Sequence, residues 1–578
     1  MVVARLLLTV ADLPATKKLI GAVSHAHGIH PCHHCGVYNG DLSSPIAYDW
    51  RALPPKLLSP KALLGEAFRH EDTRTSAQAR LIEDTYGVRY SVLNKLIGME
   101  HSKSAPLDHL HNLYLGLVKS FINILTQNDM FEGDIEGRSR AEVFSSIFNQ
   151  AQYPGHLGKL PSGVTKQMMS GKAAGLKADQ WKRVSQLLVH ALSKPRRSDE
   201  ADIPFKRNRK LWFGAAVSLC SGIRVLDSHK ISLSDAEAAT EDLAICARTM
   251  ISLGAKLTIN WHNAMHYPLH VKLFGPIGGY STWALERNNG SLSRVKHNMK
   301  EKDIPSTLLR AWLREALLAA VLHNPAPDIS ATERAAIELL LADRLTTLGT
   351  VMLNEILIRR NITARLPPPM KISPVNLKKY PAAYECLLAY VQLHHPEYDF
   401  VGRITVGDRR PCLPVTSERY LLHTHVVHQG FKFCSALYNR TVRDQYALAC
   451  LEDEASRELV QVRLFLSATL VVKNRPDLEL RLALVDKFQK GVPDQAWGYR
   501  SIDLGYRIYH DRHEAGGPLF IPIAALQASV IVSKFDQLIT CVSCDREGQE
   551  PEFWLDSDDP QADALGLEDA RGETDDET

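Results

Sequence analysis

Four residues that commonly bind zinc stand in two pairs, far apart in the chain. Cys32 and Cys35 enclose two residues, and His262 and His266 enclose three. Two thiolates at this spacing can share one tetrahedral zinc ion, but they fill only half of its coordination shell. Histidines four positions apart face the same side of a helix and can supply the other half. The two pairs together predict one structural Zn²⁺ site of the Cys2His2 type.

Each pair taken alone has an ordinary alternative. A Cys-x-x-Cys motif in a reducing compartment is a metal site in only a minority of cases, and histidines spaced by four are more often plain helix surface. His270 lies four positions beyond His266, but Pro268 interrupts helical geometry between them. We therefore rank His270 behind His262 and His266, and the zinc prediction depends on the combination of both pairs.

Two carboxylates flank these pairs at similar distances. Asp12 ends an apolar run twenty residues before Cys32, and Glu286 lies twenty residues after His266. A carboxylate at the end of a buried strand is costly unless it is paired or bound to metal. The ordinary alternatives are that Asp12 caps the next helix and that Glu286 is a surface residue of a basic helix. Their placement favours one composite site that also holds a divalent metal.

Two further motifs carry weaker signals. Asp108 stands three residues before His111, ahead of a long amphipathic segment, so a helix N-cap is the main interpretation. A metal or DNA role for this pair is the lesser alternative. Cys541 and Cys544 form a second Cys-x-x-Cys motif, but no second pair of ligands lies nearby, so we assign it no function.

Charge is distributed unevenly along the chain. The last 24 residues hold ten acidic residues against Arg571, and without them 67 basic and 55 acidic residues leave a net charge of +12. A basic body suits a polyanionic partner, although the tail alone is most simply a solvated disordered end. The basic cluster Lys206, Arg207, Arg209 and Lys210 fits a nuclear import signal, a DNA contact or a plain solvated loop.

Composition describes an ordinary globular chain of several domains. Hydrophobic residues make up 45% of 578 positions, and no apolar run reaches the ~18 residues that a membrane span needs. Ten cysteines in a chain of this length indicate a reducing compartment rather than a disulfide scaffold.

Apolar periodicity predicts the elements that must position these residues. The run at 2–11 is apolar on both faces, which predicts a buried strand. Spacing near 3.6 predicts a series of helices, and Ser234 with Glu237 predicts a capping box for one of them. Alternating segments after about residue 400 predict a smaller, separate β-rich domain. The predicted helices are 111–125, 140–150, 177–192, 211–226, 234–253, 305–322 and 330–362.

At these residues the chain resembles the fungal CACTA (En/Spm-type) transposases, including the transposase-like proteins of basidiomycete fungi. The resembling stretches follow the family's order, although each alone is weak. They are ADLPATKKLIGAVSHAHGIHPCHHC, GVRYSVLNKLIGMEHSKSAPLDHLHNLYLGLVK, LKADQWKRV and NWHNAMHYPLHVKLFGPIGGYSTWALERNNGSLSRVKHN. The resemblance implies an RNase H-like core with a large helical insertion before its last acidic residue, and hence a mixed α/β, mostly helical protein.

The resemblance also implies a division of the chain and a chemistry. It places a partial core with the zinc ligands at 1–40 and 255–300, a helical insertion at 41–254 and a helical extension at 301–365. These parts are followed by a linker at 366–400, the β-rich domain at 401–550 and an acidic tail at 551–578. In the family, two Asp and one Glu hold two Mg²⁺ or Mn²⁺ ions for DNA cleavage and strand transfer. Asp12 matches the second Asp and Glu286 the Glu.

One departure limits what this chain is expected to do. The family's first Asp lies on an earlier strand, and only eleven residues precede Asp12. We therefore expect a truncated, catalytically impaired transposase-derived protein in the nucleus. Its expected partners are DNA, with terminal inverted repeats as the target if it is active, and a second copy of itself in a homodimer; no membrane is expected. The alternatives are a non-catalytic, zinc-stabilised DNA- or chromatin-binding protein and an unrelated helical interaction protein.

Overall fold

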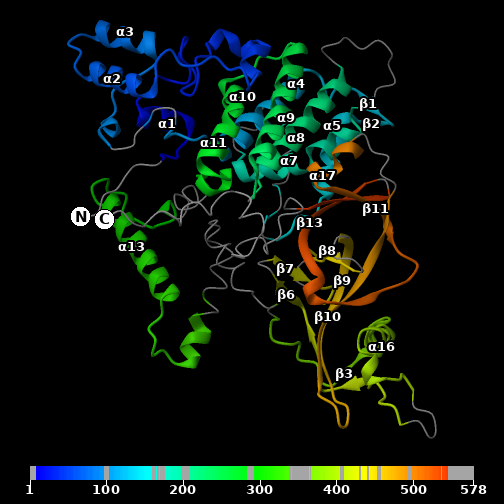
Figure 1. Ribbon diagram of the computed structural model, residues 1–578. Coiled ribbons are helices and arrows are strands. Elements are labelled where there is room, and N and C mark those ends of the chain that lie inside the picture. The colour runs from blue at the N-terminus through cyan, green and yellow to red at the C-terminus, as the bar shows by residue number, and fades with distance from the viewer. Residues whose placement is uncertain are drawn as a thin grey trace, which may run out of the picture.

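The computed structural model describes residues 8–543 with internal gaps. The longest gaps are 161–175 (Thr165 and Met168 apart), 197–207, 283–291 and 338–363 (Leu340 apart). Within these bounds the chain is mixed α/β: helices fill the first half, and a β-rich sheet fills most of the region after residue 416 (Figure 1).

A bundle of amphipathic helices forms the centre of the first half. Its longest members bury tryptophans, among them Trp181 and Trp212, which are fully inaccessible to solvent. Helices α8 and α9 approach closely at Gly222, where a Cβ would lie 2.7 Å from the carbonyl oxygen of Ala239. The bundle consists of α4 (Lys119–Gln127), α5 (Arg140–Gln150), α7 (Ala178–Ser193), α8 (Arg209–Leu226) and α9 (Leu233–Ser252).

The helices predicted from periodicity between residues 111 and 322 are present, with two differences, whereas the helix predicted at 330–362 lies mostly outside the described residues. The segment predicted at 111–125 begins as a π-helix, η4 (Leu110–Val118), before α4 continues it. The capping box of α9 is formed by Ser232 and Asp235, two residues before the predicted pair Ser234 and Glu237. Both pairs, Ser232 with Asp235 and Ser234 with Glu237, have side chains that can form a capping box. The structure uses the first pair because the helix begins at Leu233.

The strand predicted at 2–11 is not formed in its described part. Residues 8–12 have no regular secondary structure and belong to no sheet, and residues 1–7 lie outside the described ones. Thr9 donates its backbone N–H to the carbonyl of Ser104 at 2.7 Å, and no neighbouring strand is described beside it. The described part of 8–300 contains only one short hairpin, β1 (Asp134–Ile135) with β2 (Arg138–Ser139). An RNase H-like sheet is therefore not shown.

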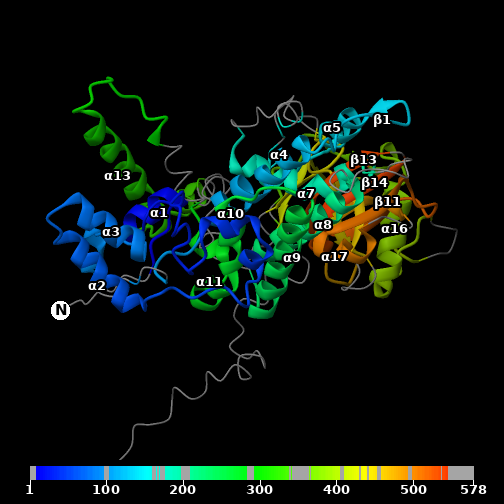
Figure 2. The same ribbon diagram turned by 90° about the horizontal axis from the view of Figure 1, so that it is seen from above.

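Smaller helices surround the bundle near the predicted zinc ligands (Figure 2). Helix α1 (Leu13–Ile20) precedes the cysteine pair, while α10 (Ile259–Asn263) contains His262 and α11 (Tyr267–Phe274) begins directly after His266. Helices α2 (Pro60–Glu71) and α3 (Ser76–Tyr86) pack on each other at one end of the molecule.

The second half is built on an antiparallel sheet whose strands close on themselves. Six strands follow in the order β10, β11, β14, β13, β8 and β9, and β9 pairs back to β10; β12 and β5 extend the sheet beside β10 and β9. The strands are β5 (Tyr420–His423), β8 (Tyr446–Cys450), β9 (Arg457–Leu470), β10 (Leu478–Lys490), β11 (Tyr506–His513), β12 (Leu519–Pro522), β13 (Leu526–Phe535) and β14 (Leu538–Ser543).

Shorter elements attach to this closed sheet. Strands β3 (Val375–Asn376) and β4 (Thr416–Ser417) form one small pair, and β6 (His425–His428) and β7 (Phe431–Cys434) form another. Helix α16 (Ala383–His394) covers the sheet near β12, and the single turn α17 (Ser501–Leu504) precedes β11.

The β-rich region has buried clusters of its own, and it also shares one buried cluster with the helical bundle. Tyr506, Ile531 and Val542 from the closed sheet belong to the same buried cluster as the tryptophans of the bundle. Tyr506 donates its hydroxyl hydrogen to the carbonyl of Gln186, and the Arg224 guanidinium donates to Ser543 Oγ at 2.7 Å. The predicted β-rich region is thus present, and part of it packs against the helical bundle.

Helix α13 (Ile304–His323) stands apart from the bundle in both views (Figures 1 and 2). It agrees with the helix predicted at 305–322. Among the described residues, no helix combines the length and the hydropathy that crossing a membrane requires.

Candidate metal centre

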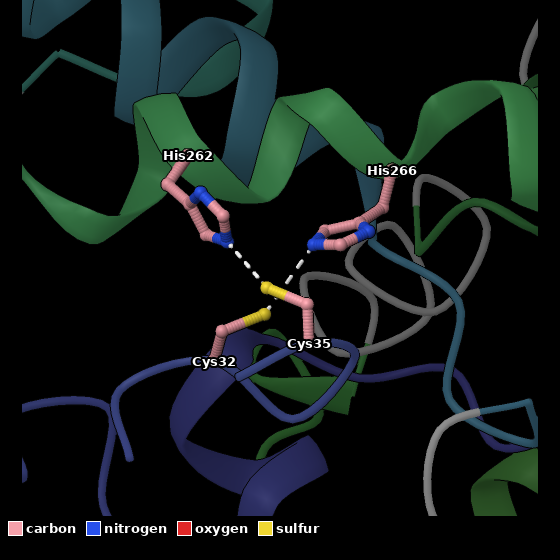
Figure 3. Close-up of side chains that lie close together, drawn as sticks. All are labelled: Cys32, Cys35, His262 and His266. Atoms are coloured by element: carbon pink, nitrogen blue, oxygen red, sulfur yellow. Dashed lines mark hydrogen bonds between the residues drawn. The ribbon is translucent and has the colours of Figure 1, made fainter. Parts of the chain in front are cut away.

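The two predicted ligand pairs meet at one buried point (Figure 3). The cysteines lie on the irregular loop after α1, and the histidines face them from α10 and the turn that follows it. Cys35 Sγ lies 3.2 Å from His262 Nε2, and Cys32 Sγ lies 3.4 Å from His266 Nε2. All four ligand atoms lie within 4.8 Å of one another.

These distances fit a tetrahedral zinc ion. Zn–S bonds of about 2.3 Å and Zn–N bonds of about 2.0–2.1 Å place sulfur and nitrogen ligands about 3.5 Å apart. The two printed sulfur–nitrogen separations agree with that value. All four residues are buried, and four protein ligands leave no coordination position for water or substrate. The cluster therefore has the donor set and the closed geometry of a structural zinc site.

The imidazole of His262 is oriented by the protein backbone. Its Nδ1 lies 2.7 Å from the carbonyl oxygen of Ala47, which accepts the Nδ1–H. This hydrogen bond fixes the tautomer that directs the Nε2 lone pair toward the sulfurs, as outer-shell partners of metal-binding histidines generally do. The carbonyl of Ala47 is one contribution that the sequence motifs do not predict.

Two lysines, the buried Lys17 and the half-buried Lys56, donate hydrogen bonds to backbone carbonyls of the cysteine loop. Lys17 Nζ donates to the carbonyl of Pro31 at 2.5 Å, and Lys56 Nζ donates to the carbonyl of Cys32 at 2.6 Å. Burial lowers the pKa of Lys17 to about 8, while the neighbouring sulfurs oppose that shift. The pKa of Lys56 is lowered for the same reason. Two cations beside two thiols favour the thiolate form that a metal ion requires.

The surroundings of the Cys32 thiol lower its pKa. Burial opposes the loss of its proton, but the hydrogen bond from Cys35 and the charges of His266 and His262 outweigh burial. The pKa of Cys32 is therefore well below its usual value. The same hydrogen bond to Cys32, together with burial, raises the pKa of Cys35, so without an ion the pair shares one proton and only Cys32 favours the thiolate.

Three further imidazoles surround the quartet without joining it. The His34 ring lies 4.8 Å from that of His266 and 4.7 Å from that of His270, measured between ring centroids, and is tilted to both. His270 is buried, and its Nδ1 accepts the backbone N–H of Leu107. Burial lowers the pKa of His33, His34 and His270, so these rings are neutral. The structure thus agrees with ranking His270 behind the two ligands.

Asp12 acts as a helix cap. Its side chain is exposed, and its Oδ1 accepts the backbone N–H of Ala15 at 2.8 Å, with Pro14 in the first turn of α1. This is the ordinary alternative for Asp12. The cap has an indirect link to the metal centre, because α1 carries the buried Lys17 toward the cysteine loop.

Glu286 lies outside the described residues, so its position relative to Asp12 is not tested. Thr282, the last described residue before the gap at 283–291, is held by hydrogen bonds to Asp108. Thr282 donates its backbone N–H at 2.9 Å and its hydroxyl at 2.7 Å to the two carboxylate oxygens of Asp108.

Asp108 and His111 form a close pair at the start of η4. Asp108 Oδ2 lies 2.5 Å from His111 Nδ1 and also accepts the His111 backbone N–H, so the predicted capping role is confirmed. Burial raises the pKa of Asp108, but the hydrogen bonds from His111 and Thr282 outweigh it and the pKa is lowered. A cavity of about 20 Å³, room for about one water molecule, joins this pair to the residues beside Asp12.

The predicted basic cluster is only partly described. Lys206 and Arg207 lie outside the described residues, and Lys210 is exposed. Arg209 stabilises the fold, because its guanidinium donates hydrogen bonds to the backbone carbonyls of Asp129, Met130 and Glu132. The sequence left an import signal, a DNA contact and a plain solvated loop open for this cluster, and at Arg209 the structure shows a role in holding the fold.

The second cysteine motif does not form a described site. Cys541 is buried within β14, and Cys544 lies outside the described residues. Within the described residues, the Cys2His2 quartet is the one group of metal-ligating side chains with compatible spacing.

Fold and site together define a helical protein with a closed β-sheet and one Cys2His2 centre of the structural zinc class. No family model matches the chain, and no curated protein or solved structure matches it either. The likeness to CACTA transposases therefore stays a prediction from the motifs.

Proposed function

We propose that the chain is a transposase-derived DNA-binding protein whose fold is held together by one structural zinc ion. The observation that carries the zinc part is the convergence of four buried ligands from positions 32 to 266. A site with four protein ligands stabilises a fold and leaves no position for catalysis at the zinc itself. The DNA part is supported by the motif likeness and by the net charge of +12 outside the acidic tail.

Zinc would act here as a clamp between distant segments. Cys32 and His266 are 234 positions apart, and the whole helical bundle lies between them in the sequence. An ion bound to both ends closes this long loop and restricts the unfolded chain, so zinc affinity becomes folding stability. No reaction step is assigned to the zinc.

Catalytic strand transfer is the second candidate, and we expect it to be impaired. Two-metal chemistry needs carboxylates that converge on the ions. The carboxylate of Asp12 instead caps α1, and the residue is exposed. The proposal is therefore a protein that binds DNA with weak or absent cleavage, in which Glu286 remains the residue to test.

Three measurements on the purified chain test this proposal. Zinc analysis should find one ion per chain. DNA affinity should fall steeply as salt concentration rises, because phosphate contacts release counterions. Nicking of terminal-repeat DNA with Mg²⁺ or Mn²⁺ should be absent or weak. A DNA affinity that does not depend on salt would contradict the DNA-binding proposal. Robust cleavage that Glu286→Gln abolishes would show instead that the chain is an active transposase.

A further inference from the structure

A cavity of about 200 Å³ lies beside the cysteine loop. Leu63 in its wall is 4% exposed, whereas Tyr38 and Leu57 are 50% and 70% exposed, so the cavity runs from a buried floor to an open mouth. The remaining lining residues include one lysine, Lys56. The apolar and aromatic part of the wall consists of Tyr38, Pro54, Pro55, Leu57, Leu63 and Tyr86.

Hydrogen bonds and close packing hold this wall in place. Gly36 donates its backbone N–H to the carbonyl of Pro54 at 2.7 Å, and a Cβ at Gly36 would lie 2.4 Å from the carbonyl oxygen of Pro55. His30, which also lines the cavity, is fixed separately, because its Nε2 lies 3.1 Å from the carbonyl oxygen of Asp84 near the end of α3. The cavity is therefore formed before any ligand enters it, as ligand sites usually are.

Lys56 supplies a positive charge to the wall of the cavity. Its Nζ donates a hydrogen bond to the carbonyl of Cys32 at 2.6 Å, and an ammonium group has three hydrogens to donate. Among the described residues, the charged groups that act on Lys56 are the sulfurs of Cys32 and Cys35, and no carboxylate pairs with it. A bound Zn²⁺ neutralises both thiolates, so the charge of Lys56 is then unbalanced. A partly buried cation without a counter-ion favours an anionic ligand.

We propose that this cavity binds a small aromatic carboxylic acid in its ionised form. The carboxylate lies beside the ammonium group of Lys56, and the ring packs among Tyr38, Tyr86 and Pro55. This activity goes beyond zinc and DNA binding, although the unbalanced charge of Lys56 rests on the proposed zinc ion.

The size of the cavity and the chemistry of its wall select this class of ligand. The cavity is smaller than the roughly 300–1,000 Å³ of pockets for drug-sized molecules, which favours a single ring over a nucleotide. Tyrosine rings pack well on other aromatic rings. Phosphate sites typically offer arginines or the N–H groups of a helix N-terminus, whereas this wall has one lysine and no arginine.

Ligand-observed NMR titration of the full chain tests the proposal, with benzoate as the probe and benzamide as its neutral counterpart. We expect one benzoate per chain with a dissociation constant of about 1 mM, because a ligand of this size has few atoms in contact. Benzamide should bind about tenfold more weakly, because it has no charge to pair with Lys56. A chain that binds neither probe, or that binds both equally, would overturn the proposal.

Two substitutions of lysine locate the charge. Lys56→Met should remove the preference, so that benzoate binds as weakly as benzamide. Lys61→Met is the matched control, because Lys61 is an exposed residue of α2 outside the cavity wall and should keep the wild-type affinity. An equal loss in both variants would overturn the role of Lys56, since it would show a general attraction by net charge.

Tyr38→Ala locates the ring without altering a charge. The side chain of Tyr38 is half exposed at the mouth, so its removal should leave the fold intact and weaken both probes. Unchanged affinities would show that the probes bind elsewhere and would overturn the proposal. N-acetylphenylalanine tests a second source of the same chemistry, the last residue of a partner chain. If it bound about tenfold more tightly than benzoate, a chain end would replace the free acid as the occupant.

Zinc content, measured on the same samples, separates this proposal from the preceding one. A chain that holds one zinc ion but does not prefer benzoate would contradict the ligand site and leave the zinc site standing. A chain without zinc that prefers benzoate would support the ligand site and contradict the zinc site. A chain with neither property would contradict both.

Discussion

The Cys35 sulfur lies 3.2 Å from the Nε2 of His262, although the two residues are 227 positions apart in the sequence. This contact joins the loop after α1 to the helix α10, with the helical bundle between them in the chain. Because the second pair, Cys32 and His266, repeats the contact, the quartet closes one long loop at a single buried point. The stability of the first half of the molecule should therefore depend on the ion.

Removing a ligand should release the zinc. We expect His262→Ala to reduce bound zinc from one ion per chain to nearly none and to lower the melting temperature, because three ligands leave the shell open. Zinc analysis after dialysis, with thermal unfolding, measures both effects. Cys412→Ser is a matched control, because this half-buried cysteine lies outside the quartet and should retain the ion. Full zinc content in His262→Ala would refute the site.

The buried Lys17 should tune zinc affinity without binding the ion. Lys17→Met keeps the apolar stem but removes the cation beside the sulfurs, and we expect zinc affinity to fall by about 10-fold, as for other outer-shell changes. Competition with a chromophoric chelator measures this affinity. Lys18→Met on the exposed side of α1 is the control and should leave affinity unchanged. Equal affinities in the two variants would mean that Lys17 only fills space.

Two substitutions at Asp12 separate capping from metal binding. Asp12→Ala removes the acceptor for Ala15 N–H and should lower the free energy of unfolding by ~1 kcal/mol. Asp12→Asn keeps an acceptor and should stay within a few tenths of a kcal/mol of wild type. Urea denaturation measures both. If Asp12→Asn were as unstable as Asp12→Ala, the negative charge rather than the cap would matter.

Asp108 should contribute stability that depends on pH. Its pKa in the folded protein lies below the unfolded value of about 3.9, so the folded state favours the carboxylate. The stability it provides is complete above that unfolded value and is lost as pH falls through the lower folded pKa. Asp108→Asn should therefore be less stable than wild type at neutral pH, with the difference shrinking below about pH 4. Denaturation across this range measures it; a constant difference would contradict the assignment.

Arg209 and Lys210 should behave differently although they are adjacent. Arg209→Ala should cost about 1–3 kcal/mol of stability, because three backbone carbonyls lose a charged donor. Lys210 is exposed, and if it contacts phosphate, Lys210→Ala should weaken DNA binding and reduce the salt slope by about one. Unfolding curves and anisotropy titrations at several salt concentrations separate the two effects. A salt slope unchanged in Lys210→Ala would remove this residue from the DNA surface.

The zinc quartet could be predicted from the sequence because each half is a local motif. Cys32 and Cys35 have ligand spacing on a loop, and the histidines have ligand spacing on a helix. Their supporting residues could not be predicted, because Lys17, Lys56 and the carbonyl of Ala47 gain their roles only through tertiary burial. A weak signal existed for Lys17: it shares one face of α1 with the buried Thr16 and Ile20.

The fold was predictable where periodicity was long and regular. Helices such as α5 and α8 agree with their apolar spacing to within two residues. The run before Asp12 was not predictable: apolar residues on both faces predicted a fully buried strand, but the described residues 8–11 are half-buried and belong to no sheet. The π-helical start of η4 was also not predictable, since its apolar residues suit an α-helix and its register depends on polar contacts such as Asn112 with the carbonyl of Asn260.

X-ray absorption at the zinc edge of the purified chain tests the central claim most directly. The account predicts a four-coordinate ion with two sulfur neighbours at about 2.3 Å and two nitrogen neighbours at about 2.0–2.1 Å. A shell without sulfur, or a chain that retains no zinc after dialysis, would contradict it.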